Sequence, residues 1–243
     1  MRDEFEQLAQ RSESQYFYKA HVENAGEHHV AWIDIMGILD HLKKGQLQPA
    51  IARGELLSVV SQHIDQERVQ VTTVGDGVII LTEDRNYLED FLDALMRHYV
   101  RFNVRNWKDG GDIWLNRLLR VGVGKGDIHL INRSRYAGMN KNGDVFHDDF
   151  RNEPFGPGMI RAMQSERGAP FSIHTNTGSQ IEPYCWWEEV GLAEESRKEI
   201  IEMLISYFDW YDAKSRYRYE PYTVGHLEDA LEYFDVEDIE EEE

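Results

Sequence analysis

The sequence of 243 residues has a single cysteine, Cys185, and no long hydrophobic run. One cysteine forms neither an internal disulfide nor a cysteine-based zinc site, which fits a reducing compartment. No apolar stretch approaches the roughly 20 residues that a helix needs to span a bilayer. The first residues are polar and do not resemble a signal peptide. We therefore expect a soluble, cytoplasmic protein that makes no membrane contact.

The chain also lacks a basic tract. It has 26 Lys and Arg against 45 Asp and Glu, a formal net charge of −19 at pH 7. Polymer phosphates are neutralised by clustered lysine and arginine, so this balance argues against a nucleic acid as the main partner. Ten of the acids lie in residues 227–243, which contain no Lys or Arg, and we expect a solvated acidic tail there. Disorder of the whole chain is excluded, because 41% of the residues are hydrophobic.

The first half of the chain predicts alternating strands and helices. Residues 29–39 are typical of a buried strand, and a helical stretch follows over 38–66. Two runs of β-branched residues in 68–82 flank Gly75-Asp76-Gly77. Glycine tolerates the backbone of a tight turn, so this segment predicts a β-hairpin. Apolar residues at helical spacing then predict a long amphipathic helix over 87–107.

The second half predicts fewer strands and more helices. We expect two strands at 118–124 and 127–131, joined by a short turn, and a long loop over 132–153. The remaining predictions are a helix at 155–167 with proline in its first turn, a strand at 170–175, and helices at 194–213 and 225–234.

The order of these elements indicates the fold class. It begins β-α-β-β-α-β, which is the split βαβ plan of ferredoxin-like folds. We therefore expect an α/β (α+β) protein in three parts. These are an N-terminal segment over 1–25, a ferredoxin-like domain over 26–185, and a helical C-terminal extension with the acidic tail over 186–243.

Two aspartates are the candidate functional residues. Asp34 stands inside the first apolar strand, and Asp76 stands in the hairpin turn. In a ferredoxin-like sheet the first strand is central and the hairpin lies beside it, so the two carboxylates converge at one edge. Two neighbouring buried carboxylates are costly unless cations accompany them. Two Mg²⁺ or Mn²⁺ ions, about 3.5–4 Å apart, would supply that charge and suit an in-line attack on phosphorus.

Each aspartate also has a plainer interpretation. Asp34 alone is compatible with a strand acid that is salt-bridged to an arginine, and Gly-Asp-Gly alone is compatible with an ordinary turn. The two aspartates in this order, with these elements between them, are more specific than either one.

Three segments resemble the motifs of class III nucleotide cyclases, D-I-x-G-F, K-x-x-G-D and R-I-G-I-x-x-G. They are Asp34-Ile35-Met36-Gly37-Ile38, residues 72–77 and residues 119–124, and the resemblance extends over roughly residues 28–175. It implies that residues 26–185 are a cyclase catalytic domain. Asp34, Asp76 and the carbonyl of Ile35 would hold two divalent cations, Mn²⁺ or Mg²⁺. The backbone amides of Met36, Gly37, Ile38 and Leu39 would bind the triphosphate.

The implied reaction is intramolecular. The ribose 3′-hydroxyl of a nucleoside triphosphate attacks the α-phosphorus and pyrophosphate leaves. Members of this family form the site at a dimer interface, so the resemblance also implies a homodimer with shared active sites.

The resemblance breaks down at the positions that select a purine. Thr72 stands where purine cyclases have a base-reading lysine, and Ile160 and Gln164 stand where they have a ribose-positioning asparagine and a transition-state arginine. Loss of the lysine indicates another base. In general plan the chain is similar to the Pycsar pyrimidine cyclases, which make cyclic UMP or cyclic CMP as an anti-phage signal that a separate effector protein reads.

We therefore expect a uridylate cyclase that acts on UTP, with CTP as the second choice. A purine cyclase with an unusual pocket stays open, and so does an inactive nucleotide-binding module with a cyclase fold. Candidates for the missing phosphate contacts are Arg120, Lys125, Arg161 and Arg167.

Overall fold

The computed structural model describes residues 22–36, 48–65, 67–74, 77–111, 117–131, 137–139, 145–147, 153–166, 168–189, 194–213 and 224–234. Several predicted features lie outside these residues and stay predictions. They are Gly37, Ile38, Leu39, Asp76, Arg167, most of the N-terminal segment and residues 235–243 of the acidic tail. Residues 227–233 of the predicted solvated tail belong to α8, and Ala230 and Phe234 are buried.

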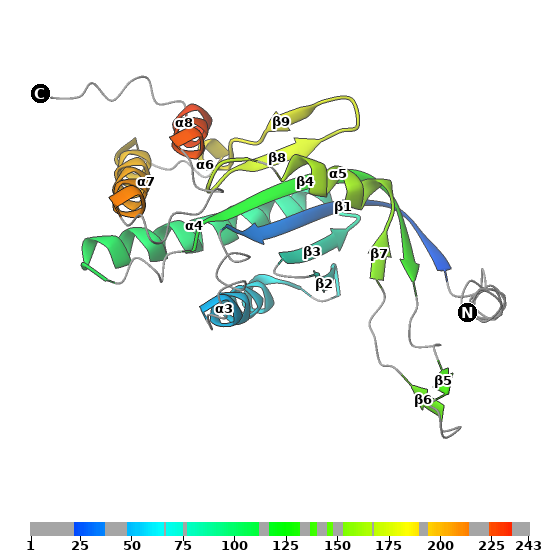
Figure 1. Ribbon diagram of the computed structural model, residues 1–243. Coiled ribbons are helices and arrows are strands. Elements are labelled where there is room, and N and C mark those ends of the chain that lie inside the picture. The colour runs from blue at the N-terminus through cyan, green and yellow to red at the C-terminus, as the bar shows by residue number, and fades with distance from the viewer. Residues whose placement is uncertain are drawn as a thin grey trace, which may run out of the picture.

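A seven-stranded sheet forms the centre of the protein (Figure 1). Its strands are β1 Val22–Ile35, β2 Gln70–Val74, β3 Gly77–Thr82, β4 Leu119–Ile131, β7 Glu153–Phe155, β8 Ile173–Asn176 and β9 Ile181–Pro183. The helices are α3 Gln48–His63, α4 Arg85–Lys108, α5 Pro157–Ser165, α6 Trp186–Glu189, α7 Glu194–Ala213 and α8 Val224–Tyr233. Two short strands, β5 Ala137–Met139 and β6 Val145–His147, pair separately.

The order of the strands confirms the predicted fold class. The path β2-β3-β1-β4 is antiparallel throughout, which is the ferredoxin-like arrangement. The sheet continues with β8, which runs parallel to β4, and with β9, which is antiparallel to β8; β7 pairs with β4. The central position of β1 follows from this order, because β3 lies on one side of it and β4 on the other.

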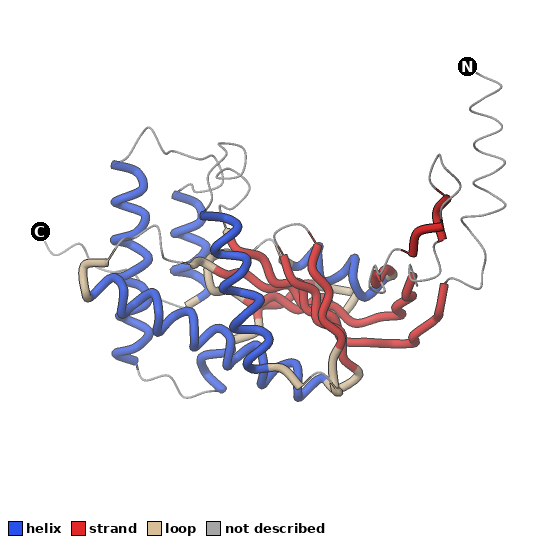
Figure 2. The backbone as a smooth tube through the Cα atoms, turned by 90° about the horizontal axis from the view of Figure 1, so that it is seen from below, coloured by secondary structure: helices blue, strands red, loops and turns tan. Residues whose placement is uncertain are grey.

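The two faces of the sheet bury different cores. Side chains alternate along β1, so Ala31 and Ile33 join the larger core, which also contains buried residues of α3 and α4. Val30 and Trp32 join a smaller core on the face that α5 covers. Asp34 continues the second series and lies on the α5 face. From below, most helices gather toward one end of the molecule, and β1 and β4 extend toward the other (Figure 2).

The prediction of two strands at 118–124 and 127–131 is wrong. A single strand, β4, pairs with β1 from Leu119, opposite Ile35, to Ile131, opposite Val22. Its glycines serve packing and not a turn. An ideal Cβ on Gly122 would lie 2.0 Å from the Ala162 carbonyl oxygen of α5. Glycine on this face therefore lets α5 lie directly on the strand.

Most other elements agree with the sequence. The hairpin forms as β2 and β3, whose last pair is Val74 with Gly77. Pro157 begins α5 and Pro49 lies in the first turn of α3, both places where proline is tolerated. The elements that the sequence did not predict are short: β7, β9, α6, and the β5–β6 pair within the segment expected to be a loop.

The C-terminal helices share the larger core with the sheet. Trp186, Ile200, Leu204 and Phe234 belong to the same buried cluster as residues of α4 and β1. The Tyr233 hydroxyl accepts a hydrogen bond from the Ile173 amide at 2.9 Å and donates one to the Tyr184 carbonyl at 2.8 Å. These contacts tie α8 to β8, while the division into domains stays a prediction. No helix in the described part of the chain is both long and apolar enough to span a membrane.

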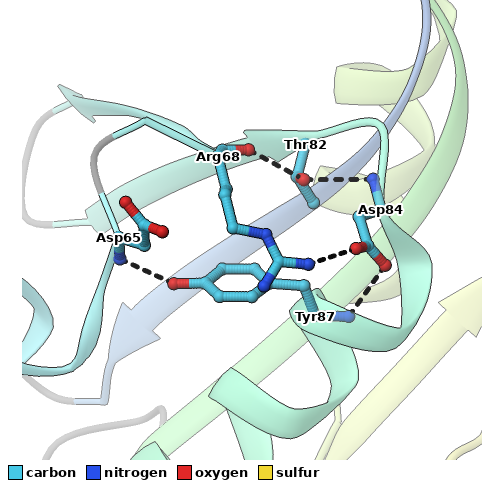
Figure 3. A network of polar contacts seen from close by, with 5 residues as sticks. All are labelled: Asp65, Arg68, Thr82, Asp84 and Tyr87. Carbon is cyan, nitrogen blue, oxygen red and sulfur yellow. Dashed lines mark hydrogen bonds and ion pairs between the residues drawn. The ribbon is translucent and has the colours of Figure 1, made fainter.

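A polar cluster around Arg68 fixes the start of α4 (Figure 3). Asp84 caps the helix by accepting from the Tyr87 amide at 3.1 Å, and it forms an ion pair with Arg68. The Arg68 guanidinium lies 4.3 Å from the centre of the Tyr87 ring. The Thr82 hydroxyl accepts from the Asp84 amide and donates to the Arg68 carbonyl, both at 3.1 Å. We call Arg68, Thr82, Asp84 and Tyr87 the Arg68 cluster.

Candidate functional site

Asp34 lies near the end of β1 and faces an arginine on the neighbouring strand. Its register partner on β4 is Arg120, and the Arg120 Nη2 atom lies 3.2 Å from Asp34 Oδ2. The Asp34 side chain is only 14% exposed. A strand acid paired with an arginine was one of the two interpretations of this residue, and the structure contains that pair.

A second carboxylate, Glu166, shares the same arginine. Glu166 follows the last residue of α5 and forms an ion pair with Arg120 Nε. The Glu166 side chain is 13% exposed and that of Arg120 is 25% exposed. The packing of α5 on β4 brings Glu166 here, since an ideal Cβ on Gly122 would lie 2.6 Å from the Glu166 amide nitrogen. We call Asp34, Arg120 and Glu166 the Arg120 cluster.

The charges of the Arg120 cluster do not balance. Two carboxylates meet one guanidinium, so the cluster is negative when both acids are ionised. Burial raises the pKa of Glu166 from its ordinary 4.5 to about 7, with Arg120 lowering it and the nearby Asp34 carboxylate raising it. A cluster with this charge favours the arrival of a further cation.

The described end of the hairpin lies next to Asp34. Asp76 is outside the described residues, but Gly77 follows it and begins β3. Val78 pairs with Ile33, the residue before Asp34, and an ideal Cβ on Gly77 would lie 3.0 Å from the Ile33 carbonyl oxygen. Among the residues that the structure describes, no three His, Cys, Asp or Glu side chains form a cation site.

Two other predicted site residues belong to the sheet region. Met36 is buried, and its amide donates to the Leu118 carbonyl at 2.8 Å, so this amide already has a partner in the fold. Thr72 is buried on β2 and pairs with Ile79, which in turn pairs with Trp32. Thr72 therefore lies on the same face of the sheet as Asp34. Its hydroxyl has no hydrogen-bond partner within the described part of the chain.

Arg161 and Lys125 lie away from the Arg120 cluster. Lys125 stands five positions further along β4 than Arg120, opposite His29, and forms an ion pair with Glu27. The Arg161 guanidinium donates to the Lys125 carbonyl at 2.6 Å. Both residues line a separate cavity of about 490 Å³ between α4 and the sheet. The structure therefore brings Asp34 and Arg120 together and leaves Arg161 and Lys125 elsewhere.

The sequence did not single out Glu166. It falls at the end of the predicted helix, where an exposed acid is common. The signal that places it is the alternation of Gly122, Gly124 and Gly126 on one face of a strand, which indicates a helix packed closely on that face. In the sequence-based prediction, Gly122 and Gly124 lie in a short strand and Gly126 in a turn after it, so the contact between the helix end and Arg120 is not predicted.

Comparison with known proteins gives a likeness of fold. No family model and no curated protein matches the sequence. Similar solved structures include the adenylyl cyclase CyaB from P. aeruginosa, with 13% identity and a TM-score of 0.46 over 70% of this chain and 83% of that one. The monomeric guanylyl cyclase domain of the RhoGC fusion protein from the aquatic fungus Blastocladiella emersonii has 14% identity and a TM-score of 0.45 over 64% and 83%.

The adenylate/guanylate cyclase/hydrolase from Silicibacter pomeroyi has 16% identity and a TM-score of 0.41 over 63% and 77%. At these identities and TM-scores, no activity and no site residue is transferred to this chain.

Proposed function

We propose that this protein is a metal-dependent nucleotide cyclase, which converts a nucleoside triphosphate to a 3′,5′-cyclic nucleotide and pyrophosphate. The observation that carries the proposal is the position of Asp34. It is a mostly buried acid on the central strand, beside the start of β3, which Asp76 precedes in the sequence. A structural strand acid needs one arginine, whereas here Glu166 adds a second acid to the same arginine.

The residues present fit a pair of divalent cations. Carboxylate oxygens of Asp34 and Asp76 and the carbonyl oxygen of Ile35 are the hard ligands that Mg²⁺ and Mn²⁺ prefer. When both acids of the Arg120 cluster are ionised, its negative charge favours the same ions. When bound, the cations would lower the pKa of the ribose 3′-hydroxyl and neutralise the triphosphate. Arg120 is the cationic side chain that the structure places next to Asp34, and its planar guanidinium suits phosphate oxygens.

We further propose that the base of the substrate is a pyrimidine. Thr72 takes the position of the purine-reading lysine, on the same face of the sheet as Asp34. A hydroxyl is uncharged and both donates and accepts hydrogen bonds, so Thr72 is able to recognise the polar edge of a small base. UTP is our first choice of substrate and CTP our second, and the product would be an anti-phage signal that a separate effector protein reads.

The proposed enzyme is a homodimer with shared active sites. The outer face of α5 supports this part of the proposal, because Ile160 is 55% exposed there and Met163 is exposed beside it. Apolar side chains that point to water on one helix face are typical of a surface that a partner covers. Sedimentation of the purified chain tests the dimer independently of activity.

The experiment that tests the function is an incubation with each of the four ribonucleoside triphosphates and Mn²⁺. We expect pyrophosphate release and cyclic UMP from UTP, a lower rate with CTP, and neither product from Asp34→Ala. Faster conversion of ATP or GTP would indicate a purine cyclase with an unusual pocket.

A specific observation favours the inactive nucleotide-binding module as the second candidate function. Arg120 already occupies Asp34, the residue that a cation would need. Nucleotide binding without pyrophosphate release from any of the four triphosphates would establish this alternative and reject the cyclase.

A further inference from the structure

The Arg120 cluster shows how a cation site can coexist with an arginine. Arg120 presents different atoms to its two acids: Nε faces Glu166, and Nη2 faces Asp34 at 3.2 Å. The second contact is longer than the about 2.7–2.9 Å of a strong charge-assisted hydrogen bond. The hydrogen bond to Asp34 is therefore a weak one, which a cation on Asp34 can replace.

The backbone prevents Arg120 from leaving the site. Its Cα is fixed opposite Asp34 by the pairing of β4 with β1, so only its side chain is able to turn away. A divalent cation on Asp34 would repel the guanidinium at this distance. The fold places one described carboxylate where it can hold the displaced arginine, and that carboxylate is Glu166.

We infer that Glu166 is a positioning residue for the cation site: it anchors Arg120, so that Asp34 exchanges the arginine for a divalent cation. The inference rests on the proposed function, because it assumes a cation at Asp34. It goes further by giving a role to a residue outside the motifs. Without Glu166, Arg120 pairs with Asp34 alone and competes fully with the metal.

The test is a titration of the nucleotide-free full chain with Mn²⁺ alone, in which electron paramagnetic resonance measures free Mn²⁺. We expect Glu166→Gln to raise the Kd for Mn²⁺ by about tenfold, the scale of one charge-assisted contact. Arg120→Gln removes the competitor and should lower the Kd. In the Arg120→Gln background, Glu166→Gln should raise the Kd by no more than about threefold, since no arginine remains to be anchored.

Two controls separate anchoring from simpler effects. Glu89→Gln removes the same charge from α4, outside the Arg120 cluster, and should leave the Kd unchanged. Glu166→Asp keeps the charge and should bind Mn²⁺ within about threefold of the wild type, even if the shorter side chain lowers the melting temperature. Circular dichroism confirms that each variant is folded.

The outcomes are distinct. An unchanged Kd for folded Glu166→Gln, or an equal increase in both backgrounds, overturns the anchoring role and leaves the cation site intact. If the wild type binds Mn²⁺ no better than Asp34→Asn, the cation site itself is absent, and both this inference and the proposed function fail.

Discussion

Two clusters in this protein use an arginine and carboxylates in different proportions. In the Arg68 cluster one arginine meets one aspartate, and both side chains are about half exposed, at 48% and 45%. In the Arg120 cluster one arginine meets two acids, and all three side chains are mostly buried. The first cluster has balanced charge at the surface. The second places two acids beside one arginine in a position where charge is costly.

This difference in charge balance and burial indicates that the two clusters have different roles. Asp84 caps α4 and Thr82 bridges backbone groups, so the Arg68 cluster is explained by the fold alone. The second acid of the Arg120 cluster is not, because one carboxylate would neutralise Arg120 at less cost. The proposed cation at Asp34 would account for the second acid. Variants that act on one cluster and spare the other test this distinction.

The largest expected effect is on catalysis. Asp34→Asn should reduce product formation by at least about 100-fold, because a bound cation contributes several kcal/mol of charge stabilisation. The rate of pyrophosphate release under saturating nucleotide and Mn²⁺ measures it. Asp84→Asn removes a carboxylate from the Arg68 cluster and should leave this rate unchanged. Equal losses in both variants would mean that the two clusters do not differ in function.

The next effect is on the packing that brings Glu166 to Arg120. Gly122→Ala places a Cβ 2.0 Å from the Ala162 carbonyl oxygen, so α5 must shift away from β4. We expect a loss of about 1–3 kcal/mol in the free energy of unfolding, measured with denaturant. Gly54→Ala is the matched control. Nothing lies within 4 Å of its new Cβ on α3, so it should be neutral or stabilising. A neutral Gly122→Ala would contradict the close packing of α5.

The same glycines show how far the sequence could be interpreted. Periodicity predicted α4 well, because its apolar residues recur at helical spacing and are buried along one face. The hairpin was predicted from two runs of β-branched residues around Gly75-Asp76-Gly77, a purely local signal. Gly122 and Gly124 were read as part of a short strand before a turn, although their reason is the backbone of α5, which lies far along the chain. Asp34 was found because an acid inside an apolar strand is conspicuous. Glu166 was missed because its importance depends on a contact across that packing.

The third effect is a change in the free energy of unfolding with pH, measured in metal-free buffer with EDTA. It has opposite signs in the two clusters. The pKa of Glu166 rises to about 7 in the folded protein, mainly through burial, so its contribution to stability is present below pH 4.5 and is lost as pH rises through 7. Relative to Glu166→Gln, the wild type should lose free energy of unfolding between pH 5 and 7.5, by at most about 1.4 kcal/mol per pH unit. Parallel curves for the two proteins would contradict this assignment.

The smallest effect concerns the Arg68 cluster itself. The Tyr87 amide hydrogen bond and Arg68 lower the pKa of Asp84, so the stability from this carboxylate is present above its ordinary pKa and is lost as pH falls. Its pH dependence is therefore opposite in sign to that of Glu166.

Asp84→Ala removes the cap of α4 and should lower the melting temperature by a few degrees at pH 7. The difference from the wild type should shrink at pH 3, where the carboxylate is protonated. The exposed neighbour Glu83→Ala is the control. An Asp84→Ala protein as stable as this control at pH 7 would show that the Arg68 cluster does not hold the start of α4.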